Sequence, residues 1–164
     1  MGHMKMKIGV ISDTHMSTPS KELCDLTSGV FSDVSMILHA GDLTRYAVLE
    51  AFSDKNVVAV SGNMDQYDVS VNFPSQRIVA VKEYRIGLVH GWGGYDGIEE
   101  RIIRSFHRMD AIVYGHTHEP ANHRKNGTLM FNPGAFSGSR FSGGRRSVGV
   151  LTIGDGIHGR IIYI

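Results

Sequence analysis

The chain has 164 residues, of which 41% are hydrophobic, and its formal net charge is +1. This length suits one domain with a buried core, and the near-neutral charge argues against binding of long nucleic acids. A single cysteine, Cys24, excludes an internal disulfide and favours a reducing, cytoplasmic compartment, and no apolar run is long enough to span a bilayer. We expect one domain over residues 5–164, with residues 1–4 as a vector-derived or disordered start.

In the first third of the chain, short apolar runs alternate with segments whose apolar residues recur at helical spacing. Strands are predicted at Lys7–Ser12, Met36–Leu38 and Val57–Val60. Thr18 marks the start of a helix after the first strand, and Thr44 is expected to cap a second helix. This β-α-β-α-β succession predicts a parallel sheet with right-handed crossovers.

The rest of the chain is richer in strands. A capping-box pattern at Asp96–Glu99 precedes a helix, and a further strand is predicted at Ala111–Tyr114. Three hairpins are expected, joining Arg77–Val81 to Tyr84–Val89, His123–Lys125 to Leu129–Phe131 through Asn126-Gly127, and Val148–Ile153 to Ile157–Tyr163. These strands are more than a simple doubly wound sheet contains. We therefore predict an α/β fold of two mixed β-sheets packed face to face with helices outside.

Side chains that can bind metal follow five of the predicted strands. In open α/β sheets, sites form at the carboxyl ends of strands, so these groups are expected to meet at one edge. The candidate ligands are Asp13, His15, Asp42, Asn63, His90, His116 and His118.

The mixture of carboxylate, amide and imidazole groups indicates which metals would bind. It suits manganese, iron, cobalt, nickel or zinc, whereas calcium would need an all-oxygen site and a structural zinc site would use cysteine. Seven ligands exceed the needs of one ion, which favours two ions sharing a carboxylate. Such a pair would supply hydroxide near neutral pH, and its residual positive charge would attract a phosphoester.

The motifs Asp13-x-His15, Gly41-Asp42, Gly62-Asn63, His90-Gly91 and Gly115-His116-Thr117-His118, in this order, resemble the calcineurin-like metallophosphoesterase superfamily. The size resembles its small YfcE-type branch. The resemblance implies a four-layer αββα sandwich with a dinuclear site, for which manganese is the preferred ion. By position, Asp13, His15, Asp42 and His118 would hold one ion, Asp42 would bridge, and Asn63, His90 and His116 would hold the other.

One departure from the family pattern affects the expected substrate. Many phosphatases of the superfamily have a histidine after the Gly-Asn pair, where it protonates the leaving group, but this chain has Met64. We therefore expect small phosphodiesters to be preferred over phosphomonoesters. Asn63, Asp65 and His116 are the candidate catalytic residues. Asp65 could supply an acid or position water, or it could be a turn residue that binds its own backbone.

Other polar residues have structural interpretations that compete with functional ones. His39 is expected to pack beside the site, His107, His123 and His158 to lie on the surface, and Cys24 to lie in the core. Trp92 could either pack against the protein or stack on a ring of the substrate. Three arginines could bind phosphate at the mouth of the site, although a solvated loop is the interpretation that we favour: Arg140, Arg145 and Arg146.

Two functions of different class remain open on the sequence. The first is a phosphodiesterase that uses a metal-bridging hydroxide on a small phosphoester. The second is a metal-binding protein-interaction scaffold, since the retromer subunit that shares this compact fold acts mainly in that way. A homo-oligomer is compatible with either.

Overall fold

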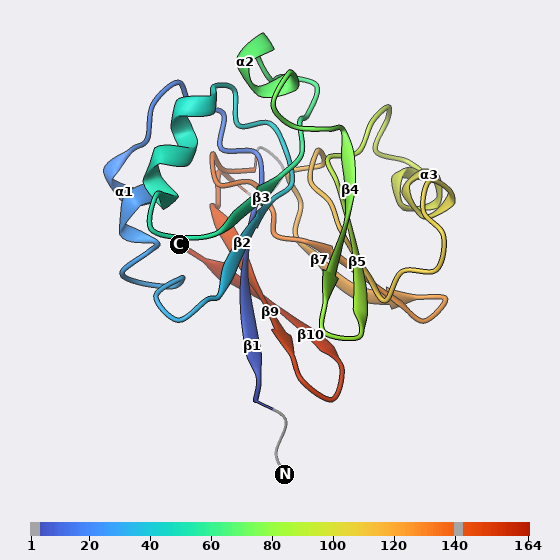
Figure 1. The fold of residues 1–164 in the computed structure, drawn as a ribbon. Coiled ribbons are helices and arrows are strands. Elements are labelled where there is room, and N and C mark those ends of the chain that lie inside the picture. The colour runs from blue at the N-terminus through green and yellow to red at the C-terminus, as the bar shows by residue number, and fades with distance from the viewer. Residues whose placement is uncertain (1–3, 140–142) are drawn as a thin grey trace.

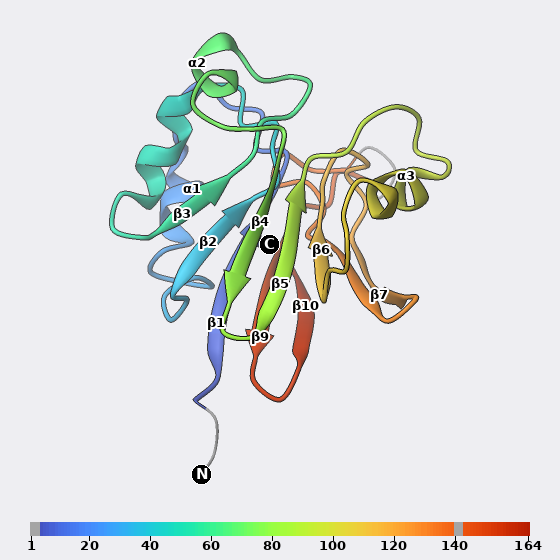
Figure 2. The same ribbon diagram turned by 45° about the vertical axis from the view of Figure 1, so that its right-hand side comes forward.

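The computed structural model describes residues 4–139 and 143–164, which form two mixed five-stranded sheets (Figures 1 and 2). The first sheet has the spatial order β10 (Ile157–Tyr163), β9 (Ser147–Ile153), β1 (Met6–Ile11), β2 (Met36–His39) and β3 (Val57–Ala59). The second has the order β4 (Gln76–Val81), β5 (Tyr84–Val89), β6 (Ala111–Val113), β8 (Thr128–Asn132) and β7 (Ala121–Lys125).

The parallel strands of each sheet bring their carboxyl ends together. β1, β2 and β3 pair in parallel, as the alternating pattern predicts, and β5 pairs in parallel with β6. In Figure 2, β2, β3 and β5 all run toward the upper end of the molecule. Loops after strands of both sheets therefore meet at this end.

Three apolar clusters show that the fold has four layers. The largest lies between the sheets and contains Ile8, Leu88 and Phe131. A second lies between the first sheet and the helices α1 (Lys21–Asp25) and η1 (Tyr46–Phe52). A third lies between the second sheet and α3 (Ile98–Arg104). The fold is the predicted αββα sandwich, with a short helix α2 (Tyr67–Ser70) at the upper end in Figure 1.

The predicted starts of the three helices are wrong. Helix α1 begins at Lys21, where the Ser20 side chain accepts a hydrogen bond from the backbone amide of Leu23, and Thr18 lies outside it. Thr44 does not cap the 3₁₀ helix η1, whose preceding residue Arg45 makes no side-chain cap. The residue before α3 is Gly97 in a left-handed conformation, so the expected capping box does not form.

Cys24 is exposed, so its assignment to the core is wrong. The α-helical segment ends at Asp25, after which the chain continues in turns, and Leu23 is the residue of this helix that is buried. The periodic pattern therefore extends further than the helix itself.

Two further predictions concern the ends and the surroundings of the chain. Of the proposed vector-derived residues 1–4, only Met4 lies within the described residues, where it is exposed. Within residues 4–139 and 143–164, no helix has the length and apolar character that crossing a membrane requires. The cytoplasmic location stays a prediction.

Candidate metal centre

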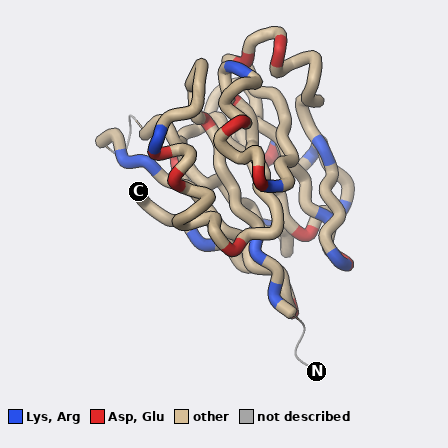
Figure 3. The backbone as a smooth tube through the Cα atoms, turned by 60° about the vertical axis from the view of Figure 1, so that its left-hand side comes forward, with Lys and Arg blue, Asp and Glu red and all other residues tan. Residues whose placement is uncertain are grey.

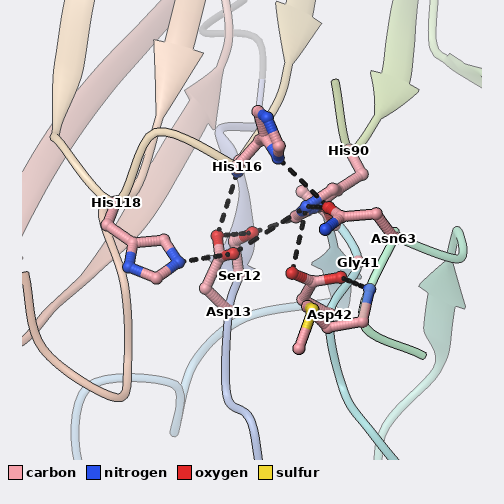
Figure 4. Close-up of polar contacts among 12 residues, drawn as sticks. Ser12, Asp13, Gly41, Asp42, Asn63, His90, His116 and His118 are labelled. Carbon is pink, nitrogen blue, oxygen red and sulfur yellow. Dashed lines mark hydrogen bonds and ion pairs between the residues drawn. The ribbon is translucent and has the colours of Figure 1, made fainter. Parts of the chain in front are cut away.

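The seven candidate ligands lie on loops that follow β1, β2, β3, β5 and β6. Figure 4 labels all of them except His15. Five of them have left-handed backbone conformations, which non-glycine residues seldom adopt and which cluster at functional sites. Their φ angles are 54° at Asp13, 48° at His15, 56° at Asp42, 70° at His116 and 62° at His118. His116 and His118 are therefore not on an extended segment.

One group of ligands gathers around Asp13. Its Oδ1 atom lies 3.1 Å from Nε2 of His118 and 3.5 Å from Nε2 of His15. The two imidazole Nε2 atoms are 3.3 Å apart. Because these three side chains converge from loops after β1 and β6, they can share one divalent cation, as the sequence predicts.

A second group gathers around Asn63. Its Oδ1 atom lies 3.1 Å from Nε2 of His90 and 3.1 Å from Nδ1 of His116. Nε2 of His90 also lies 3.2 Å from Oδ2 of Asp42. His116 and His118 thus contribute to different groups, which fits two adjacent metal positions.

Asp42 lies between the two groups. Its Oδ2 atom is 3.2 Å from Nε2 of His90 and 3.7 Å from Nε2 of His15. Its Oδ1 atom is held from the other side by the backbone amide of Met64 at 2.8 Å. This places one carboxylate oxygen where a bridging ligand would stand.

Hydrogen bonds to the backbone fix how two imidazoles face the centre. Nδ1 of His90 donates to the carbonyl of Ala40 at 2.8 Å, and Nε2 of His116 donates to the carbonyl of Gly93 at 2.8 Å. In the neutral rings, Nε2 of His90 and Nδ1 of His116 then carry lone pairs. Both face the Asn63 oxygen. Burial by itself would lower the pKa of His90, but the carboxylates of Asp42 and Asp13 outweigh it and raise this pKa, so the position attracts a proton or a cation.

Buried charge gives a second sign that the residues fit a cation. Oδ1 of Asp13 is fully buried, and the described part of the chain gives it no hydrogen bond of regular geometry, although Nε2 of His118 lies 3.1 Å away. Burial by itself would raise the pKa of Asp13, but the imidazoles of His118, His15 and His90 outweigh it and lower this pKa. The Asp13 carboxylate raises the pKa of His15 in turn. The charge of Asp13 and the protonation of the imidazoles around it therefore depend on one another.

Glycines allow the ligand loops to approach one another closely. A Cβ atom at Gly62 would lie 2.2 Å from Oδ1 of Asp42, and one at Gly115 would lie 2.0 Å from Oγ of Ser12. Ser12 in turn donates a 2.6 Å hydrogen bond to Oδ2 of Asp13. The glycines in the sequence motifs are therefore required by space at the ligands.

Asp65 faces the backbone of the ligand loops. Its Oδ2 atom accepts hydrogen bonds from the amides of Gly62 at 2.7 Å and Asp42 at 3.1 Å, and its Oδ1 atom accepts one from Thr44 at 2.7 Å. Burial raises the pKa of Asp65 despite these amides. Since both oxygens are engaged, this geometry favours the turn interpretation over that of an acid, although the catalytic role itself stays a prediction.

The other histidines take the structural positions expected of them. His39 is fully buried, accepts a hydrogen bond from the amide of Gly41 and contacts Thr14, which agrees with packing beside the site. His107 and His158 are exposed, and His123 pairs with Glu99 on the surface.

A cavity of about 690 Å³ opens over both groups and is lined by His15, Asp42, Asn63, Met64, Tyr95, His116, His118 and the 137–139 segment with Gly144. Tyr95 is a site residue that sequence reasoning missed, because it stands in a glycine-rich loop with no periodic pattern. Arg145 and Arg146 are not part of the lining, since their guanidinium groups lie over the rings of Tyr163 and Phe136. Arg140 lies outside the described residues.

An αββα sandwich that gathers Asp, His and Asn side chains at the ends of five strands defines a metal-binding phosphoesterase fold. The family model described as the calcineurin-like phosphoesterase superfamily domain matches residues 6–156, and the chain belongs to this superfamily. A probable metallophosphoesterase of Methanothermobacter thermautotrophicus is 35% identical over 132 residues, which cover 79% of this chain and 77% of that protein.

Two solved structures show the same fold. One, described as a novel archaeal phosphodiesterase, has a TM-score of 0.76 and 25% identity and covers 97% of this chain and 100% of that chain. The other, vacuolar protein sorting 29 from Cryptosporidium parvum, has a TM-score of 0.73 and 23% identity and covers 98% of both chains. The second similarity concerns the fold alone.

Proposed function

We propose that this protein is a phosphodiesterase that requires two divalent cations and cleaves small phosphodiesters to a phosphomonoester and an alcohol. The observation that carries the proposal is the position of Asp42, whose Oδ2 atom lies between His15 and His90 and so joins two groups of ligands. Two bound cations would supply hydroxide near neutral pH and positive charge for the phosphoryl oxygens. Manganese is the ion we expect first.

The residues around the cations hold the ligands and the substrate. The backbone carbonyls of Ala40 and Gly93 keep His90 and His116 in the orientation that turns their lone pairs inward. His116 is half-buried at the floor of the cavity, where it would stabilise charge on the phosphoryl group together with Asn63.

The residue at position 64 supports a diester over a monoester. The side chain of Met64 is exposed and lines the cavity, and it carries no proton that it could give to a leaving group. Phosphodiesters whose leaving groups are already good depend least on protonation of the leaving group. A diester also carries one negative charge where a monoester carries up to two, which suits a cavity without Lys or Arg in its described lining.

The distribution of charge supports a small substrate over a long nucleic acid. Lys and Arg segments are scattered over the backbone together with Asp and Glu segments in Figure 3, and the net charge is +1. Long nucleic acids require a continuous basic track to replace counterions along the phosphates. We therefore expect short diesters to be the substrates.

The test compares metal-stripped wild-type protein with Asp42→Asn after addition of Mn²⁺, Ni²⁺, Zn²⁺ or Mg²⁺. Wild-type protein should cleave bis-p-nitrophenyl phosphate faster than p-nitrophenyl phosphate. Asp42→Asn should lose metal retention at both positions and at least about 100-fold in activity, because the shared ligand is gone. Asp110→Asn, a surface carboxylate that accepts the amide of Arg85, is the matched control and should behave as wild type.

Full metal retention or activity in Asp42→Asn would refute the shared ligand. If the monoester were cleaved as fast as the diester, the proposal that Met64 makes the site prefer diesters would be refuted.

The alternative is a metal-binding scaffold for protein partners, which the fold similarity to vacuolar protein sorting 29 supports. Metal binding without cleavage of either nitrophenyl ester would favour it over the enzyme. Recovery of partner proteins from a lysate irrespective of metal would support it further.

A further inference from the structure

A second cavity adjoins the candidate metal centre and shares Asn63 with the larger cavity. It has a volume of about 320 Å³, and Asn63, His90, Ser75, Gln76 and Trp92 are among its lining residues. Asn63 also lines the larger cavity of about 690 Å³. Both volumes fall within the range of about 300–1,000 Å³ that small-molecule sites occupy. The centre is therefore flanked by two spaces that meet at one residue.

The lining of both cavities is suited to uncharged groups. Apart from the candidate metal ligands, it consists of small, polar or apolar residues, and no Lys or Arg belongs to it in the described part of the chain. A phosphate with one organic substituent would leave one cavity facing a charged oxygen. A phosphate with two substituents would present an uncharged group to each.

One loop supplies an aromatic side chain to each cavity. Trp92 lines the smaller cavity and Tyr95 the larger one, and their side chains are 44% and 47% exposed. Tyr95 also packs edge-on against the ring of His116, with ring centroids 5.6 Å apart. Aromatic rings with about half of their surface exposed to a cavity can stack on rings of a ligand.

The loop that carries both aromatic residues is fixed to α3. The Arg101 guanidinium donates hydrogen bonds to the carbonyls of Asp96 at 2.8 Å and Trp92 at 2.9 Å, and also to that of Gly94. The intervening Gly93 carbonyl accepts the hydrogen bond of His116. Trp92 and Tyr95 are thus held at a set spacing on either side of the centre.

We propose that the site selects phosphodiesters with two aromatic or nucleoside-like substituents, one held beside Trp92 and the other beside Tyr95. This inference rests on the proposed phosphodiesterase function and specifies its substrate class. On this proposal either cavity receives a ring while the phosphoryl group stays at Asn63, which lines both.

Binding of phosphinates tests the inference without turnover, because their P–C bonds are not hydrolysed. Affinities of metal-loaded protein are measured by calorimetry for diphenylphosphinate, methylphenylphosphinate and dimethylphosphinate, with phenylphosphonate as the monoester analogue. Trp92 is the only tryptophan of the chain, so its fluorescence reports directly on the smaller cavity. Each added phenyl group should tighten binding about tenfold, since one stacked ring contributes about 1–3 kcal/mol.

The pattern across variants is the decisive result. Trp92→Ala or Tyr95→Ala should weaken diphenylphosphinate about tenfold and leave methylphenylphosphinate nearly unchanged, because its one ring can use the remaining cavity. The double variant should weaken both ligands to the level of dimethylphosphinate. Trp92→Phe and Tyr95→Phe should retain wild-type affinity, and so should Tyr67→Ala, an exposed residue that lines neither cavity.

Equal affinity for diphenylphosphinate and methylphenylphosphinate, or single variants without effect, would overturn the inference even if the protein cleaves diesters. Tight binding with the predicted pattern but no metal-dependent cleavage would instead refute the proposed function alone.

Discussion

The Asp65 carboxylate connects the two loops that carry the candidate ligands Asp42 and Asn63. It accepts the amides of Asp42 and Gly62, and Gly62 directly precedes Asn63. It also accepts a 2.7 Å hydrogen bond from the amide of Thr44, whose φ of 84° is unusual for threonine. A side chain in this position acts on the ligands through the backbone.

Replacement of Asp65 by Asn distinguishes this positioning role from proton donation. Asp65→Asn should lower the free energy of unfolding by about 1–3 kcal/mol, because an amide group cannot accept all three backbone hydrogen bonds. It should also weaken metal retention, while the pH profile of kcat keeps its shape. Asp110→Asn, which loses one such bond at the surface, is the control for unfolding. Loss of one limb of the pH profile in Asp65→Asn would show that Asp65 is the acid after all.

The sequence predicted the residues of the centre better than their geometry. Polar groups after apolar strands are visible in one dimension, and Asp13, Asp42 and His118 lie together as the strand pattern implies. The division of His116 and His118 between two groups agrees with what the family resemblance implies. The left-handed backbone at these residues depends on contacts between the sheets, which the strand pattern does not show. Tyr95 was missed for the same reason, since only the fold brings its loop beside His116.

At the level of elements, the link between α3 and the loop after β5 connects the outer layer to the site. Arg101 on α3 reaches three carbonyls of this loop, and the loop places Trp92 and Tyr95 at the two cavities. A helix on the outside of the second sheet thereby holds the loop that lines both cavities.

Removal of this link should loosen the loop while the sandwich stays folded. Arg101→Ala should speed hydrogen exchange of amides 92–96 by about tenfold or more, because hydrogen bonds from a charged donor are lost. It should also raise KM more than it lowers kcat. Arg104→Ala, on the same helix and exposed, should change neither quantity. Unchanged exchange in Arg101→Ala would mean that the loop is held by other contacts.

The elements were predicted where local chemistry decides them. Asn126 has a φ of 52° and Gly127 one of 84°, which is the backbone that their hairpin turn requires. The predicted cap of η1 was wrong because of the backbone at Thr44. Its φ of 84° lies outside the extended conformation of a capping residue, and its amide is held by Asp65, 21 residues away.

For the molecule as a whole, the buried His39 links stability to pH. Burial lowers its pKa from 6.5 to about 3, with the charge of His90 in the same direction and those of Asp13 and Asp42 in the opposite one. Between these values the unfolded chain binds a proton that the folded protein does not. The contribution of neutral His39 is therefore complete above pH 6.5 and decreases as the pH falls toward 3.

Metal-stripped protein should consequently lose about 1.4 kcal/mol of unfolding free energy per pH unit through His39 as the pH falls below about 6. Chemical denaturation across this range should show a shallower slope for His39→Asn, whose side-chain oxygen can still accept the amide of Gly41. His158→Asn, at the surface, should keep the wild-type slope. NMR titration of the His39 ring in wild-type protein gives an independent result, and a pKa near 6.5 would contradict the prediction.

The left-handed backbone of the centre also affects which substitutions evolution can accept there. Asp, Asn and His tolerate positive φ better than β-branched residues do, and they are also the residues that bind metals. At Asp13, Asp42 and His118, selection for catalysis and selection for a foldable chain therefore favour the same few amino acids. A descendant of this protein that abandoned catalysis should still drift mainly among Asp, Asn, His and Gly at these positions.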